Sequence, residues 1–85
     1  MSRRYELRTT SRFDRSFRQL DERNKLRVSR EIFKLESDPL IGKVLHGELK
    51  GLRSLRIGDY RVIYEILGES VVMHLVEHRR RVYER

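Results

Sequence analysis

A two-residue turn between two strand-like segments most constrains the fold of this 85-residue chain. Gly58–Asp59 separates Leu52–Ile57 from Tyr60–Ile66, and a turn of this length between such segments is a β-hairpin signal. A third segment, Val71–Val76, follows the turn at Leu67–Glu69. Its residues are apolar at both parities, which is typical of a strand with neighbours on both sides. The C-terminal half is therefore predicted to be three antiparallel strands.

The hairpin turn also predicts which residues face each other. Taken literally, it pairs Arg56 with Arg61, and alternation then sorts the two strands into faces. One face is mostly apolar and should cover helices; it carries Leu55, Ile57, Tyr60, Val62, Tyr64 and Ile66. The outward face carries Leu52, Ser54, Arg56, Arg61, Ile63 and Glu65.

The facing arginines suggest a phosphate clamp. Like charges across a strand pair destabilise by up to about 1 kcal/mol, so folding gains nothing from the pair. A phosphate bound between the two guanidinium groups would turn repulsion into bidentate binding. The alternative is that Arg56 pairs with Asp59 and Arg61 with Glu65 for purely structural reasons, or that a bulge at Gly58 breaks the register.

The N-terminal half predicts one strand and two helices. Tyr5–Thr9 alternates as a strand, and Ser11 followed by Asp14 resembles a capping box. A short amphipathic helix carrying Phe13, Phe17 and Leu20 should follow. Asp21 is the expected N-cap of a longer helix, whose apolar side is Leu26, Ile32, Phe33 and Leu35, widened by Val28. Pro39 ends this helix, because it disfavours helical backbone in the preceding residue.

The predicted fold class is α+β with the order β-α-α-β-β-β, a helical hairpin packed on one face of a small antiparallel sheet. Residues 40–50 are expected to form a loop. The length predicts a single domain over residues 1–85.

Composition excludes several kinds of site. The chain has no cysteine, and its three histidines lack the spacing of a metal site, so neither a disulfide, a metal nor a cofactor is expected. No apolar stretch approaches the roughly 20 residues of a membrane span. We therefore expect a soluble cytoplasmic protein without a membrane partner.

The charge points towards nucleic acid. The net charge is +7, and subtracting Lys25, Lys34, Lys43 and Lys50 from the 20 basic residues leaves 16 arginines. Arginine binds phosphate bidentately and stacks on bases, although the same bias can serve solubility alone. The segment 78–85 adds four arginines and Tyr83, a combination suited to single-stranded RNA. The alternative for this segment is a solvated, frayed end.

Two stretches resemble the RelE/ParE toxin superfamily. They are Leu49–Tyr64, with its Arg-x-Gly-Asp-Tyr-Arg-Val-Ile-Tyr run, and Val76–Tyr83. The resemblance implies the toxin of a type II toxin–antitoxin pair. RelE-type members cut mRNA in the ribosomal A site without a metal, using the 2′-hydroxyl as nucleophile and leaving a 2′,3′-cyclic phosphate. ParE-type members poison DNA gyrase instead.

The resemblance also implies roles for individual residues. Arg61, Arg79 and Tyr83 fall on catalytic positions of RelE-type toxins. Further RNA contacts are expected from Arg56, Lys50, Arg53, His78, Arg80 and Arg81. Two basic positions of some RelE-type toxins are Leu52 and Ser54 here, which leaves the general base open between His78 and Tyr83. His74 is predicted to be a packing or surface histidine, and His46 has no assigned role.

The alternatives to a nuclease are a ParE-like gyrase poison, a non-catalytic antitoxin-binding homologue and an RNA-binding domain without toxicity. On the toxin interpretations the expected partner is a cognate antitoxin, in a complex that could be 2:2; the nuclease would also bind mRNA in the A site. Leu45, Leu49 and Leu52 could anchor the antitoxin, but we favour core positions for them.

Overall fold

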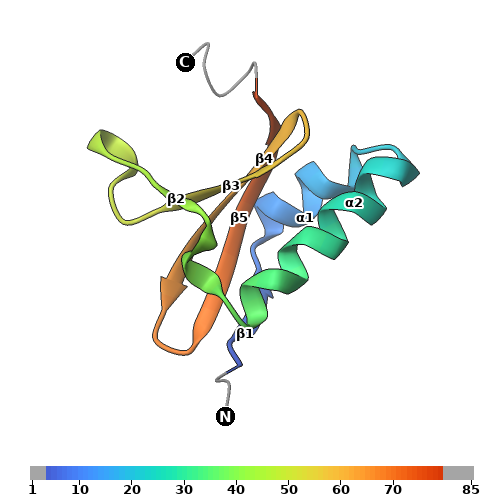
Figure 1. Ribbon diagram of the computed structural model, residues 1–85. Helices are drawn as coiled ribbons and strands as arrows, with labels where there is room; N and C mark the ends of the chain where they lie inside the picture. Colours follow the sequence, from blue (N-terminus) through green and yellow to red (C-terminus); the bar gives the residue numbers. More distant parts are fainter. Residues whose placement is uncertain (1–3, 80–85) are drawn as a thin grey trace.

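The computed structural model describes residues 4–79, and it shows two helices packed against one face of a five-stranded sheet (Figure 1). The strands are β1 (Glu6–Thr9), β2 (Lys43–Val44), β3 (Arg53–Ile57), β4 (Tyr60–Leu67) and β5 (Ser70–His78). The α-helices are α1 (Ser11–Arg18) and α2 (Glu22–Phe33), and three short 3₁₀ turns are η1 (Lys34–Glu36), η2 (Pro39–Ile41) and η3 (Gly47–Leu49). The predicted α+β class and helical hairpin are confirmed.

The sheet is mixed, not purely antiparallel as expected. Its strand order is β1-β5-β4-β3-β2, and β1 runs parallel to β5 while the other neighbours are antiparallel. The direction of β1 was not predictable from the turns, because β1 and β5 lie near opposite ends of the chain. The expected loop over residues 40–50 also contains the short edge strand β2, which pairs with Arg53 and Ser54.

The register of the central hairpin is the predicted one. Arg56 lies opposite Arg61, and Ile57 lies opposite Tyr60 across the two-residue turn. The predicted inward face does meet the helices, since Leu55, Val62 and their neighbours are buried. The core comprises Phe13, Val28, Leu35, Leu55, Ile57, Val62, Tyr64, Val71, Met73 and Val76, with Tyr60 and Ile66 packed against it.

The two helices begin at side-chain caps. The Asp21 carboxylate accepts from the backbone N–H of Asn24 at 2.8 Å, as predicted. The prediction of Ser11 as the first cap is wrong, because Thr10 has extended backbone and its hydroxyl accepts from Phe13 N at 3.1 Å. The capping residue therefore lies one position earlier than the sequence pattern indicated.

The buried stripe of α2 also differs from the predicted one. Val28, Ile32 and Leu35 recur at i, i+4 and i+7 and turn towards the sheet, with Val28 and Leu35 fully buried. Leu26 and Phe33 lie off this stripe and are 55% and 64% exposed. Their assignment to the apolar core side was wrong, because a stripe centred on Val28 leaves both residues facing outward.

A buried tyrosine fastens the segment before β3 to the sheet. The hydroxyl of Tyr64 donates to Pro39 O at 2.7 Å and accepts from Gly42 N at 2.9 Å. A Cβ at Gly42 would meet the Tyr64 ring carbons at 2.7 and 2.8 Å, so only glycine allows this approach. Burial raises the pKa of Tyr64 above 10.0, while the Gly42 hydrogen bond and the nearby Arg53 charge oppose the rise.

Candidate nucleic-acid interface

The helix-free face of the sheet carries the predicted arginine pair. Arg56 on β3 and Arg61 on β4 are direct cross-strand neighbours, so their side chains leave the same face of the sheet. Arg56 is exposed, whereas Arg61 is half-buried with its Nε atom fully buried. On the other flank of Arg61 lies Glu77 of β5. Arg61 therefore has one cationic and one anionic cross-strand neighbour.

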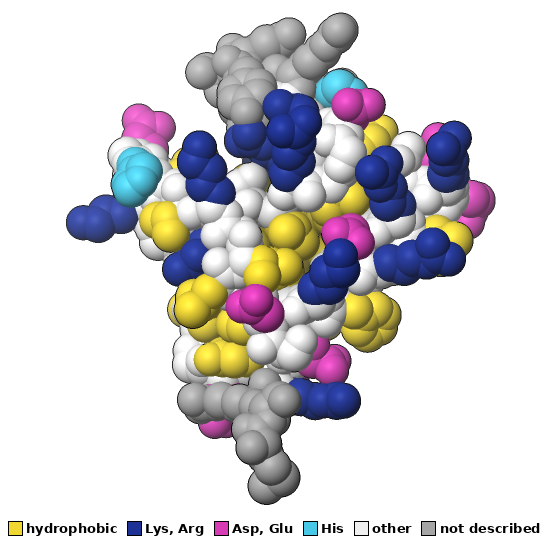
Figure 2. Space-filling view, in the orientation of Figure 1, with side chains coloured by type: hydrophobic (Ala, Val, Ile, Leu, Met, Phe, Trp, Pro, Cys, Tyr) yellow, Lys and Arg dark blue, Asp and Glu magenta, His cyan; other side chains and the backbone are white. Residues whose placement is uncertain are grey.

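Arg79 joins this pair through the backbone. Its N–H donates to Asp59 O at 2.8 Å, which extends the pairing of β4 and β5 one residue beyond β5. The hydrogen bond holds the Arg79 backbone at the hairpin turn. Its acceptor, Asp59, lies two residues before Arg61 in the chain. The Arg79 side chain is half-buried and its Nε atom is buried. Figure 2 shows basic side chains gathered at this end of the molecule, next to the end of β5.

The remaining predicted site residues do not share this arrangement. Arg53 lies on the helix-side face and donates to Gly42 O at 3.0 Å and Leu40 O at 3.4 Å. His78 faces Tyr60, and the two rings make an edge contact with centroids 5.3 Å apart. Lys50 is exposed directly after η3. Arg80, Arg81 and Tyr83 lie outside the described residues.

A groove of about 620 Å³ runs along the same helix-free face. Apolar side chains from Leu49, Leu52, Ile63 and Leu75 line part of it, and ionisable side chains supply the rest. The ionisable residues that line it are Arg12, His46, Glu48, Glu65, His74 and Glu77. Because Glu77 is the strand neighbour of Arg61, the groove begins beside the arginine pair.

Inside the groove, His74 and Glu65 form a hydrogen-bonded pair that the sequence pattern did not show. His74 Nε2 lies 2.7 Å from Glu65 Oε1, and both side chains are about one-third exposed or less. A register shift at Ile63/Tyr64 moves β5 relative to β4 here, and such a bulge is invisible to simple alternation. His74 is thus a half-buried, paired histidine, in keeping with its predicted packing role, while His46 is exposed.

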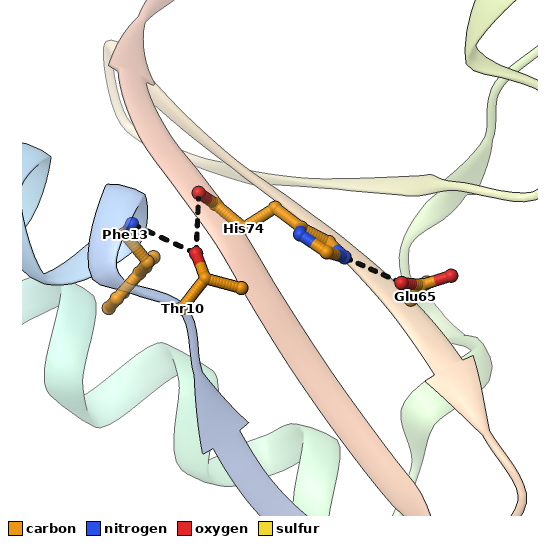
Figure 3. A network of polar contacts seen from close by, with 4 residues as sticks. All are labelled: Thr10, Phe13, Glu65 and His74. Atoms are coloured by element: carbon orange, nitrogen blue, oxygen red, sulfur yellow. Dashed lines mark hydrogen bonds and ion pairs between the residues drawn. The ribbon is translucent and has the colours of Figure 1, made fainter.

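Thr10 ties this part of the groove to the first helix (Figure 3). Its hydroxyl accepts from Phe13 N at 3.1 Å and donates to His74 O at 3.2 Å. One side chain therefore caps α1 and also holds the β5 backbone next to the bulge. This contact fixes the backbone from which the His74 ring reaches Glu65.

The leucines that we favoured as core do not all lie in the core. Leu49 is 45% exposed and lines the groove, and Leu52 lines it as a half-buried residue. Leu45 is half-buried in the same segment. The preference for core was wrong for all three, since none of them belongs to the core or packs against it, and Leu49 and Leu52 line the groove on the open face of the sheet.

Within residues 4–79, no three histidine, aspartate or glutamate side chains gather in a way that could hold a metal ion. No helix in that part of the chain is both long and apolar enough to cross a membrane.

Comparison with known proteins places this chain in a family. The family model described as ParE toxin of the type II toxin–antitoxin system parDE matches residues 5–83. Toxin RelG of Mycobacterium tuberculosis is 44% identical over 54 residues, which are 60% of this chain. The match spans 62% of that relative's length.

Solved structures give the same assignment. A chain of the toxin–antitoxin complex RelBE2 from Mycobacterium tuberculosis superposes with a TM-score of 0.84 at 36% identity, covering 89% of this chain and 99% of that one. A chain of the Escherichia coli RelBE complex shares the fold, with a TM-score of 0.75, 20% identity and coverages of 87% and 95%. The family match over residues 5–83 and the RelBE2 similarity together show that this chain belongs to the RelE/ParE superfamily of type II toxin–antitoxin toxins.

Proposed function

We propose that this toxin is an endoribonuclease that cuts mRNA in the ribosomal A site by metal-independent transesterification. The observation that carries the proposal is the Arg56–Arg61 pair, with Arg79 hydrogen-bonded through its backbone to the same hairpin. The Arg56 and Arg61 side chains leave the same face of two consecutive strands, and the backbone of Arg79 is held at the turn that joins those strands. A phosphodiester is the ligand whose charge and shape suit such a set.

In the proposed reaction the arginines stabilise developing negative charge. Arg61 and Arg79 would donate to the phosphoryl oxygens as the 2′-oxygen attacks phosphorus, and Arg56 would hold the neighbouring phosphate. Half-buried guanidinium groups suit this role, because a partly water-excluded charge stabilises a transition state more than an exposed one does. Arginine here supplies the positive charge that a metal ion supplies in metal-dependent nucleases.

The ribosome would supply much of the remaining catalysis by aligning the mRNA. Tyr83 would stack on a base or take part in proton transfer, and Lys50, His78, Arg80 and Arg81 would add RNA contacts. Arg53 has a structural role instead of an RNA contact. Its guanidinium donates to the carbonyls of Leu40 and Gly42 on the opposite face.

Arginine substitutions in a purified translation system test the proposal. Arg61→Ala and Arg79→Ala are each expected to slow mRNA cleavage by about 10²–10³, the usual loss on removing a transition-state donor. Arg23→Ala removes the same charge from an exposed position on α2 and should cleave at the wild-type rate. Wild-type rates in both site variants, with folding confirmed by circular dichroism, would refute the nuclease assignment.

We also propose a cognate antitoxin as partner and the cytoplasm as the site of action. The two similar structures described above, RelBE2 of Mycobacterium tuberculosis and RelBE of Escherichia coli, are toxin–antitoxin complexes, which supports a partner of the same kind. An antitoxin covering the helix-free face would keep the arginines from RNA, and a 2:2 assembly is compatible with such a partner. Co-expression with the product of the neighbouring gene, followed by light scattering, measures both binding and stoichiometry.

A second candidate function is a ParE-like gyrase poison. The observation that favours it is the pair Leu52 and Ser54, which cannot supply the charges that some RelE-type toxins carry there; Ser54 is also 6% exposed and faces little solvent. Toeprinting of mRNA after induction separates the two functions. A-site cuts support the nuclease, whereas double-strand DNA breaks with intact mRNA support the gyrase poison.

A further inference from the structure

We infer that Glu77 is the general base of the proposed cleavage, accepting the proton of the attacking 2′-hydroxyl. The inference rests on the proposed function. It names a general base, a role that Leu52 and Ser54 cannot fill at the two positions where some RelE-type toxins are basic. Neither a leucine nor a serine at those positions can carry out acid–base chemistry at neutral pH.

The register of the sheet places Glu77 next to the arginines. Glu77 lies directly opposite Arg61 across β4 and β5, and directly opposed residues have Cβ atoms about 4.5–5.5 Å apart. It lies two residues before Arg79, which is held beside the hairpin turn by its hydrogen bond to Asp59 O. A phosphate held by Arg61 and Arg79 would therefore have the Glu77 carboxylate at its edge.

Glu77 also faces the space where RNA would lie. Its half-buried side chain lines the groove of about 620 Å³ on the helix-free face. A ribose beside the bound phosphate would enter this groove and present its hydroxyl to the carboxylate. With Arg56, Arg61 and Arg79 as cations and Glu77 as the anion, the set keeps a net charge of about 3 − 1 = +2, so it still attracts a phosphate.

The other acid–base groups of the groove fit this role less well. Glu65 lies four residues from Arg61 on β4, roughly 13 Å along the strand. Glu48 and His46 belong to the segment around η3, outside the paired strands that carry the arginines. Among the carboxylates that line the groove, Glu77 alone is a direct strand neighbour of one of the three arginines.

The chemistry balances without a co-reactant. The carboxylate takes the proton from the 2′-hydroxyl, and the 2′-oxygen forms a bond to the adjacent phosphorus. The bond from phosphorus to the 5′-oxygen breaks with its electron pair, and that oxygen takes a proton from water. The products are a 2′,3′-cyclic phosphate and a free 5′-hydroxyl, and Glu77 returns its proton to solvent.

The test compares Glu77→Gln with Glu22→Gln on programmed ribosomes under single-turnover conditions with saturating toxin. Both substitutions replace a carboxylate by an amide of nearly the same shape, but Glu22 is exposed at the start of α2, on the helix side of the sheet. Glu77→Gln is expected to slow cleavage by about 10²–10⁴ and to remove the acidic limb of the pH–rate profile. Its affinity for RNA should be unchanged or higher, because a negative charge has left the phosphate site. Glu22→Gln should keep the wild-type rate and profile.

The outcomes distinguish an error in the Glu77 assignment from an error in the proposed nuclease activity. Slow cleavage by Arg61→Ala together with wild-type or faster cleavage by Glu77→Gln overturns the base and leaves the nuclease standing. Absence of mRNA cleavage by the wild-type toxin overturns both. Glu77→Asp keeps a carboxylate on a shorter stem and should retain the acidic limb at a reduced rate. If this variant matches Glu77→Gln in rate and profile, the carboxylate is not the base.

Discussion

The hydroxyl of Tyr64 joins β4 to the segment that contains Pro39 and Gly42. It donates to Pro39 O and accepts from Gly42 N inside the core, so both of its hydrogen-bonding roles are used. The segment that it fastens leads through β2 and η3 to the groove, where Leu49 and Leu52 form part of the lining. Tyr64 therefore supports the wall of the site from the opposite face of the sheet.

Removing this hydroxyl should destabilise the whole domain. Tyr64→Phe leaves a buried N–H and a buried carbonyl without their partner, so we expect the free energy of unfolding to fall by about 1–3 kcal/mol. Urea denaturation measures the change. The matched control is Tyr60→Phe, which keeps the ring contact with His78 and should cost less than about 0.5 kcal/mol. Equal losses in the two variants would contradict the role of the Tyr64 hydroxyl.

The raised pKa of Tyr64 gives this stabilisation a pH dependence. Burial is the main cause, and the pKa of an unperturbed tyrosine is 10.0. Above that pH the unfolded chain loses a proton that the folded chain keeps, so the unfolded state binds fewer protons and stability falls as pH rises. The stability difference between wild type and Tyr64→Phe should therefore shrink above about pH 10 and stay constant between pH 7 and 9.

The first helix depends on a cap that also anchors the sheet. α1 has only eight residues, and a helix of that length is marginal without tertiary contacts. Thr10→Val keeps the shape of the side chain but removes the bonds to Phe13 N and His74 O, so we expect a loss of about 1–2 kcal/mol in unfolding free energy. Ser11→Ala, at the exposed position that sequence pattern favoured as the cap, should cost less than about 0.5 kcal/mol. A larger loss for Ser11→Ala would contradict the observed cap.

Local signals were sufficient for the elements that a few consecutive residues determine. The Gly58–Asp59 turn fixed the hairpin register, and with it the facing of Arg56 and Arg61, because a two-residue loop allows one pairing. The two-residue strand β2 gave no periodicity to detect. The parallel direction of β1 depends on the return of the chain through both helices, which no local pattern encodes.

Local signals likewise determined only part of the candidate site. The facing of Arg56 and Arg61 follows from the hairpin turn and strand alternation, whereas Arg79 was assigned only through the resemblance to RelE-type toxins. Arg53 was expected to contact RNA, but its bonds to the Leu40 and Gly42 carbonyls place it on the helix-side face. The groove and the His74–Glu65 pair arise from the bulge at Ile63/Tyr64 and from the position of η3, so both required coordinates.

The molecule as a whole carries a net charge of +7, which attracts any polyanion. Its helix face contributes to that charge through exposed arginines such as Arg23, while the helix-free face holds Arg56 beside Arg61. Long-range attraction depends on the sum of all these charges, whereas bound phosphates are neutralised only by the cations that touch them. The salt dependence of RNA binding distinguishes these two contributions.

Arg56→Ala and Arg23→Ala each lower the net charge by the same amount. A purely bulk attraction would weaken equally in both variants. If Arg56 contacts a phosphate, its loss should lower the slope of log K against log salt concentration by about 0.7 for single-stranded RNA, while Arg23→Ala leaves the slope unchanged. Fluorescence anisotropy with a short RNA at several potassium chloride concentrations measures both slopes. Equal slopes in the two variants would mean that Arg56 does not contact a phosphate directly. It would then attract RNA only through the total charge of the protein.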